Sequence, residues 1–104
     1  MKLAQQSADD FIAQAFDVER LFVDRVGVGA LRPEAKLLLL INQQGTLSIK
    51  QAMSMSGLSH RGFYMLLNRL SSHDLIVITP DVHDKRVKKI GLADKANIAK
   101  LITG

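Results

Sequence analysis

The sequence predicts an α+β fold that is mostly helical and carries one two-stranded β-hairpin in its C-terminal third. Two helical segments joined by a Gly-containing turn occupy residues 48–72, and a β-branched run that closes at Pro80 begins the hairpin. The chain has 104 residues and an apolar fraction of 47%, which suits one domain with a modest core. We therefore expect a single domain over 1–104, made of an N-terminal helix (1–30), a central body (31–92) and a short C-terminal helix (93–104).

The composition excludes several classes of protein. The chain has no cysteine, which excludes a disulfide framework and a thiolate metal site. Its longest aliphatic run, Leu37 to Ile41, is far shorter than the roughly 20 residues of a membrane span. Polar residues follow Leu3-Ala4, so the N-terminus lacks the apolar stretch of a signal peptide. We expect a soluble cytoplasmic protein that has no membrane partner.

The charge of the chain is unevenly distributed. The formal net charge is +4, but residues 1–31 carry three basic and five acidic side chains, whereas residues 32–104 carry eleven basic and five acidic ones. A basic body behind an acidic N-terminal helix suggests that the body alone faces a polyanion. A solvated surface with chance asymmetry would give the same numbers, so the charge does not decide the question by itself.

The first helix is predicted from about Ser7 to Val26, with Ser7 as its cap. Its apolar stripe is wider than the roughly 100° that a surface helix needs. Two interpretations remain open, a central core helix or a dimer helix, and we favour the second. The residues that we expect at the dimer interface are Phe11, Ala15, Phe16 and Phe22.

The next two helices are marked by their ends. Pro33 opens the second, which ends at Gly45 and buries Leu37, Leu38, Leu40 and Ile41. A short extended link, Thr46-Leu47, precedes the third helix, about Ser48 to Ser56, where Gln51 can complete a capping box with Ser48. Gly57 then supplies a left-handed turn.

The fourth helix, Ser59 to Ser72, has one apolar stripe and a polar remainder. Its core stripe is Phe63, Leu66, Leu67 and Leu70, spaced i, i+3, i+4 and i+7. The pattern leaves Met65 open, either at the core margin or on the polar surface. That surface can donate hydrogen bonds to base edges or accept them, from His60, Arg61, Tyr64 and Asn68.

The hairpin consists of a strand at 75–79 that closes at Pro80, a six-residue tip at 81–86 and a strand at 87–92, and a short helix starts at Asp94. Two helices with a tight turn can place the second one in a DNA major groove, and a basic hairpin beside it suits phosphates or a minor groove. We therefore expect a winged helix-turn-helix that binds double-stranded DNA as a homodimer, paired through its N-terminal helix. The predicted DNA-binding residues are Ser59, His60, Arg61, Tyr64, Asn68, Arg69, Lys85, Arg86 and Lys88. For Lys50 and Lys89 a phosphate contact and a merely solvated side chain are equally supported.

Enzyme chemistry finds no support in the sequence. The three histidines have no metal-ligand spacing, and neither a phosphate-cradling Gly loop nor a nucleophile elbow is present. The run Asp81-Val-His83-Asp84 contains metal-ligating types, but such residues at a hairpin tip are usually turn formers. We expect no catalytic site, metal or cofactor.

From Leu31 onward the chain resembles the MarR family of winged-helix transcriptional regulators. The motifs that carry the resemblance are Asp74-Leu-Ile76, Pro80-Asp-Val-His-Asp84-Lys-Arg86 and Lys89-Ile-Gly-Leu92, with Gly57-Leu-Ser59 at the entry to the fourth helix. The resemblance implies that Arg86 reaches a minor groove or a phosphate, and that Asp84 helps to hold the wing.

The resemblance also allows a small-molecule effector between the dimer helices and the DNA-reading part. The chain differs from the family at Ile78, where an Arg often stands on the first wing strand, so its wing is less charged. This difference and the Phe-rich first helix leave an alternative function open, a winged-helix module that binds proteins instead of DNA.

Overall fold

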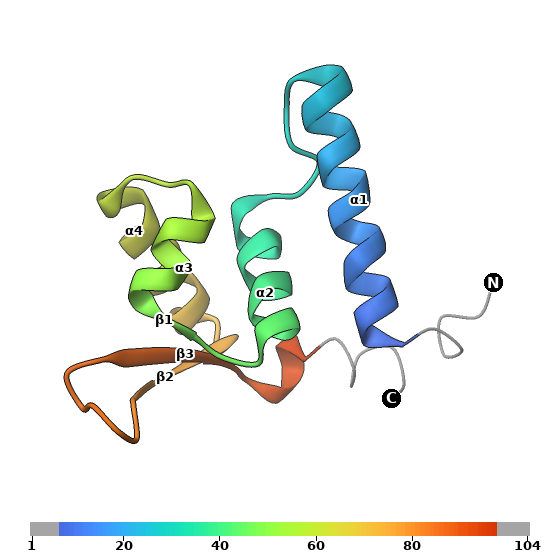
Figure 1. Ribbon diagram of the computed structural model, residues 1–104. Helices are drawn as coiled ribbons and strands as arrows, with labels where there is room; N and C mark the ends of the chain where they lie inside the picture. The colour runs from blue at the N-terminus through green and yellow to red at the C-terminus, as the bar shows by residue number, and fades with distance from the viewer. Residues whose placement is uncertain (1–6, 98–104) are drawn as a thin grey trace.

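The computed structural model describes residues 7–97, in which four α-helices and a small sheet follow one another along the chain (Figure 1). The order is α1 (Ala8–Val26), α2 (Pro33–Gln44), β1 (Leu47–Ser48), α3 (Ile49–Ser56), α4 (His60–Ser72), β2 (Ile76–Pro80) and β3 (Lys88–Leu92), followed by a 3₁₀ turn at Asp94–Ala96. The predicted α+β, mostly helical class with a winged helix-turn-helix is confirmed.

The helices begin where their local sequence predicts. The hydroxyl of Ser7 accepts a hydrogen bond from the backbone N–H of Asp10 at 3.1 Å, and Pro33 opens α2. Ser48 and Gln51 form the predicted capping box at the start of α3. These contacts satisfy backbone N–H groups that have no partner inside the first turn of a helix.

The sheet has three strands instead of the predicted two. The strand order is β1-β3-β2, and β1 pairs antiparallel with β3 through Leu47 opposite Ile90 and Ser48 opposite Lys89. The sequence indicated only an extended link here, because two residues are too few to show an alternating pattern. The pairing joins the start of α3 to the second wing strand and so fixes the wing relative to the helices.

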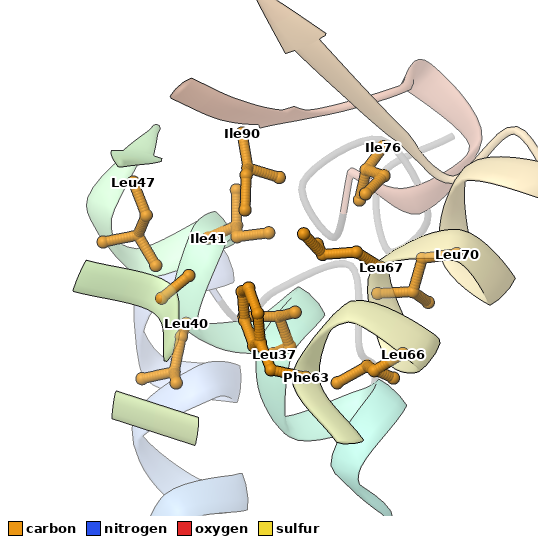
Figure 2. Close-up of a cluster of buried hydrophobic side chains, with 11 residues drawn as sticks. Leu37, Leu40, Ile41, Leu47, Phe63, Leu66, Leu67, Leu70, Ile76 and Ile90 are labelled. Atoms are coloured by element: carbon orange, nitrogen blue, oxygen red, sulfur yellow. The ribbon is translucent and has the colours of Figure 1, made fainter. Parts of the chain in front are cut away.

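The core lies between α2, α4 and the inner face of the sheet (Figure 2). The predicted stripe of α4 is buried in full, with Phe63 at its centre. On α2 the prediction needs one correction, because Leu39 is buried and Leu38 is only half-buried. The helix lies between α1 on one side and α3 and α4 on the other, so its buried surface is broader than a single stripe (Figure 1).

α1 packs on α2 through its first half only. Ile12 is buried and Phe16 contacts the core cluster, whereas Phe11 and Ala15 are half-buried. Of the predicted dimer residues, Phe22 alone is exposed. The second half of the helix exposes a larger set, which we call the α1 apolar surface: Val18, Leu21, Phe22, Val23 and Val26.

The loop after α1 is tied back to the helix. The side chain of Glu19 accepts a hydrogen bond from the backbone N–H of Leu31 at 2.8 Å. This bond holds the end of the loop against the middle of α1, so that the helix and the start of α2 keep a fixed relation. The α1 apolar surface is therefore presented by an anchored helix.

The end of the described chain differs from prediction. Ala93, not Asp94, occupies the cap position of the final turn, and Asp94 is its first residue. The apolar residues of the predicted C-terminal helix, Ile98, Leu101 and Ile102, lie outside the described residues. Within 7–97 no helix is both long enough and apolar enough to cross a membrane.

Candidate nucleic-acid interface

The side of α4 opposite its buried stripe forms a continuous exposed surface. Arg61, Tyr64, Met65 and Asn68 share it, because they too are spaced i, i+3, i+4 and i+7. We call these four residues the outer face of α4. Arg61 forms no ion pair within residues 7–97, so its guanidinium is available to a partner. The ring of His60 contacts that of Tyr64, with centroids 4.8 Å apart and the planes tilted by 44°.

Two predicted DNA-binding residues are engaged elsewhere. The Ser59 hydroxyl accepts a hydrogen bond from the backbone N–H of Gly62 at 3.1 Å and so begins α4. Arg69 donates from Nη1 to a carboxylate oxygen of Glu34 in α2, also at 3.1 Å. The structure thus turns Arg69 toward α2 and away from the outer face, and its charge is offset by an acid 35 residues earlier in the chain.

Asp81 organises the tip of the wing, the segment 81–87 between β2 and β3. Its Oδ2 accepts hydrogen bonds from the backbone N–H groups of His83 and Asp84, both at 3.0 Å. Its Oδ1 lies 3.4 Å from the Nζ of Lys89. The sequence pattern did not single out this role, although an Asp directly after a proline is a familiar turn former that bonds to the backbone two residues on. The contact also accounts for Lys89, whose ammonium is paired within the wing.

Asp84 and Arg86 form a second contact in the wing. Asp84 Oδ1 accepts from the backbone N–H and from Nε of Arg86, both at 3.1 Å, and Oδ2 accepts from Nη2 at 3.2 Å. The Arg86 side chain is nevertheless 91% exposed. The carboxylate therefore orients the guanidinium without covering it, which is the arrangement expected of a residue that holds the wing. Lys85 and Lys88 are exposed and form no ion pair within the described part of the chain.

Both wing carboxyls are stabilised in their ionised form. Hydrogen bonds from the backbone N–H groups of Asp84 and His83, with a smaller contribution from Lys89, hold the pKa of Asp81 below its usual value. The side chain of Arg86, and then its backbone N–H, lower the pKa of Asp84 in the same way. A hydrogen bond to the charged form of an acid favours that form.

We expect the wing to lose its order in acid. Because the folded pKa of Asp81 is lowered, its stabilising contribution is present above the ordinary pKa of 3.8 and is lost as the pH falls through the folded value below it. The amide resonances of His83 and Asp84 should shift together in an NMR titration, with a midpoint below 3.8. Asp81→Asn keeps an acceptor oxygen and should abolish the low-pH shift of the His83 amide, whereas the Asp84 amide should still report the titration of its own carboxyl. Asp81→Ala should displace both amides at neutral pH. A midpoint above the ordinary value would contradict this account.

The wing and α4 border one groove. It has a volume of about 480 Å³ and is lined by Ser48, Ile49, Lys50, Met53, Tyr64, Arg86, Val87 and Lys88. The structure therefore brings the outer face of α4, the cationic wing and the start of α3 to one side of the molecule. The resemblance placed an effector between the first helix and the DNA-reading part, and this groove lies elsewhere.

The metal-ligating residue types of the wing tip do not form a cluster. Within residues 7–97 no group of three His, Cys, Asp or Glu side chains is arranged to hold a metal ion. The carboxylates of Asp81 and Asp84 are occupied by the hydrogen bonds described above. These residues act as turn formers in the wing.

Known structures of transcriptional regulators share the arrangement of the helices and the wing. No family model and no curated protein matches the chain. A probable transcriptional regulator from Pseudomonas aeruginosa aligns with a TM-score of 0.62 at 18% identity over 88% of this chain and 69% of its own. A mutant MarR from E. coli, complexed with operator DNA, aligns with a TM-score of 0.60 at 17% identity over 88% of this chain and 64% of its own.

The heme sensor protein PefR from Streptococcus agalactiae, in complex with heme, is more similar in sequence. It aligns with a TM-score of 0.59 at 26% identity over 88% of this chain and 58% of its own. The chain spans about six tenths of the length of most of these proteins. The resemblance found in the sequence is thus confirmed by the arrangement of the helices and the wing. The chain has the winged-helix fold of the MarR-like transcriptional regulators.

Proposed function

We propose that the chain is a sequence-specific regulator that binds double-stranded DNA as a homodimer. The outer face of α4 enters the major groove, and the wing lies on the adjacent phosphates or minor groove. The observation that carries the proposal is the shared groove, in which Tyr64 of α4 borders Arg86 and Lys88 of the wing. One side of the molecule thereby combines groups that bind base edges with groups that bind phosphates.

The two sets of side chains suit different parts of a duplex. Arg61 can donate two hydrogen bonds to a guanine, and Asn68 can pair with an adenine in the same bidentate way. Lys85 and Lys88 offer unpaired charges, whereas Arg86 offers a guanidinium whose direction Asp84 fixes. A mutant MarR with a similar fold was solved in complex with operator DNA, which supports a DNA duplex as the partner.

The homodimer is part of the proposal because one protomer presents few base contacts. A two-fold dimer reads two half-sites about one helical turn apart, which multiplies affinity and specificity. The α1 apolar surface supplies an interface, since a contiguous apolar patch on an anchored helix is unfavourable in water. The second half of α1, which carries this surface, also lies away from the wing and α4 (Figure 1).

A small-molecule effector belongs to the same proposal. The structural neighbour PefR is a heme sensor solved with heme, which gives a precedent for a ligand on this fold. The groove beside Tyr64, at about 480 Å³, falls in the size range of ligand sites. A ligand bound there would stand between α4 and the wing and would compete with DNA.

DNA binding is tested by titrating a duplex selected from a random pool at several salt concentrations. Affinity should fall steeply, with a slope of about −0.9 in log K against log salt for each phosphate contact. Arg86→Ala should weaken binding on every sequence, whereas Arg61→Ala should cost about 1–3 kcal/mol and also relax the base preference. Arg20→Ala on α1 is the matched control and should leave binding unchanged, because Arg20 lies beside Asp17 on another helix. An equal loss on all sequences for Arg61→Ala and Arg86→Ala would contradict the division of roles.

A protein-binding module is the second candidate function. It is favoured by the exposed apolar side chains of the wing, Val77 and Ile78 on β2 and Val82 at the tip. The same titration separates the two functions, because a protein-binding wing would hold no duplex even at low salt. Absence of binding under those conditions would favour the second candidate.

A further inference from the structure

We infer that Tyr64 and Met65 read thymine, by packing against the C5 methyl groups that thymine displays in the major groove. The inference rests on the proposed DNA binding and assigns a chemical specificity to two side chains of the outer face of α4. The sequence pattern left Met65 between the core margin and the polar surface. The structure places it on the surface, 53% exposed.

The two side chains lie in the middle of the outer face. Arg61 precedes them by one helical turn and Asn68 follows by one turn, so two hydrogen-bonding side chains flank an apolar pair. Tyr64 is 38% exposed, which leaves part of its ring accessible. A helix that enters a major groove with Arg61 and Asn68 toward the bases brings Tyr64 and Met65 toward the bases between them.

The apolar character of this pair determines which group on a base edge it can recognise. Of the groups at the base edges in the major groove, the thymine methyl is the apolar one, and the others are hydrogen-bond donors or acceptors. Met has a flexible, polarisable side chain that adapts to an irregular apolar surface. A Tyr ring offers a broad apolar area, and its hydroxyl can stay in water.

Contacts with neighbouring rings hold the Tyr64 side chain in one orientation. Its ring contacts that of His60 in a tilted arrangement, with centroids 4.8 Å apart, and lies edge-on to the buried ring of Phe63 at 5.7 Å. A ring held from two sides loses little freedom when a base packs against it. Single exposed apolar residues are common on protein surfaces, but an adjacent pair between two base-binding side chains forms a continuous reading surface.

The test removes the methyl groups and nothing else. Deoxyuridine pairs like thymine but lacks the C5 methyl, so the selected duplex is resynthesised with deoxyuridine at one thymine pair at a time. Affinity should fall about fourfold for each methyl that the pair contacts, in keeping with the transfer energy of one buried methylene. Thymines outside the half-sites should tolerate the change.

Variants connect the effect to the side chains. Met65→Ala should bind the thymine and deoxyuridine duplexes equally well at the position that Met65 contacts, and Tyr64→Ala should do so at the neighbouring position. Met55→Ala removes an exposed methionine from α3 and is the matched control, which should keep the full methyl dependence.

The outcomes distinguish this inference from the function on which it rests. Unchanged affinity for a duplex with deoxyuridine at every thymine would overturn methyl reading and leave DNA binding intact. A methyl dependence that survives both Tyr64→Ala and Met65→Ala would assign the reading to other residues and also overturn the inference. Failure of any selected duplex to bind would overturn the DNA-binding proposal itself.

Discussion

Leu21→Asp is expected to convert the proposed homodimer into a monomer. Leu21 is 54% exposed on α1, so an Asp there should cost the isolated fold little. In a dimer that buries the α1 apolar surface, the carboxylate of the new Asp would be buried without a basic side chain to pair with it. An uncompensated buried charge costs several kcal/mol, so the dissociation constant of the dimer should rise by at least about 100-fold. A concentration series in sedimentation measures this change directly.

DNA binding should report the same change in a specific way. The variant should lose affinity for a duplex with two half-sites but keep the affinity of one protomer for a duplex with a single half-site. Ala13→Asp adds the same charge at an exposed position on the side of α1 that carries Asp17 and Arg20, outside the apolar surface, and should stay dimeric. A Leu21→Asp protein that remains a dimer would show that copies pair through another surface. A purely monomeric parent protein at high concentration would refute the homodimer.

The elements that the sequence predicted are those whose causes are local. A helix start depends on a cap and on the three or four residues after it, which is why Ser7, Ser48 and Ser59 each marked a boundary that the structure confirms. The buried stripe of α4 was also predictable from the sequence, because four large apolar residues share one face of the helix and the other faces are mostly polar.

The features that were missed depend on residues far apart in the chain. β1 exists because Leu47 and Ser48 meet β3 some forty residues later, and no pattern within two residues can encode that. The pairing of Arg69 with Glu34 likewise requires α2 and α4 to be side by side. A polar surface on a helix shows which side chains are available but not which of them a neighbouring helix neutralises. The sequence could therefore indicate which side chains are candidate DNA contacts, but not which of these candidates are already paired with another residue of the chain.

The wing lies between these two cases. The family resemblance at Asp84-Lys-Arg86 pointed to Asp84 and Arg86, whose mutual hydrogen bonds the structure contains. The role of Asp81 depends partly on a local turn, which the sequence could have indicated. It depends also on Lys89, which comes within reach only because β3 turns back along β2.

Phe63→Ala is expected to cause the largest loss of stability of any single substitution in α4. Phe63 is 0% exposed and is among the largest fully buried side chains of the cluster that joins α2, α4 and the sheet (Figure 2). Replacing a buried Phe by Ala costs about 3–5 kcal/mol, because apolar contacts are lost and a cavity remains. Since a small domain has a total stability of only about 5–15 kcal/mol, this loss is a large fraction of the whole, and the variant approaches unfolding if the parent lies at the low end of that range. Chemical denaturation at a fixed protein concentration measures the free energy of unfolding.

Tyr64→Ala is the matched control, because it removes an aromatic ring from the next position of the same helix. Tyr64 is 38% exposed and contacts the rings of His60 and Phe63, so its loss should cost about 1–2 kcal/mol, clearly less than the loss of Phe63. The two variants should therefore separate folding from recognition: Phe63→Ala lowers stability, and Tyr64→Ala lowers DNA affinity in a stable protein. Equal destabilisation by both would mean that the outer face is covered in solution, for example by a partner, and that α4 does not face DNA. A stable Phe63→Ala protein would contradict the core that orients the helix, and with it the reason that Arg61, Tyr64 and Asn68 point outward.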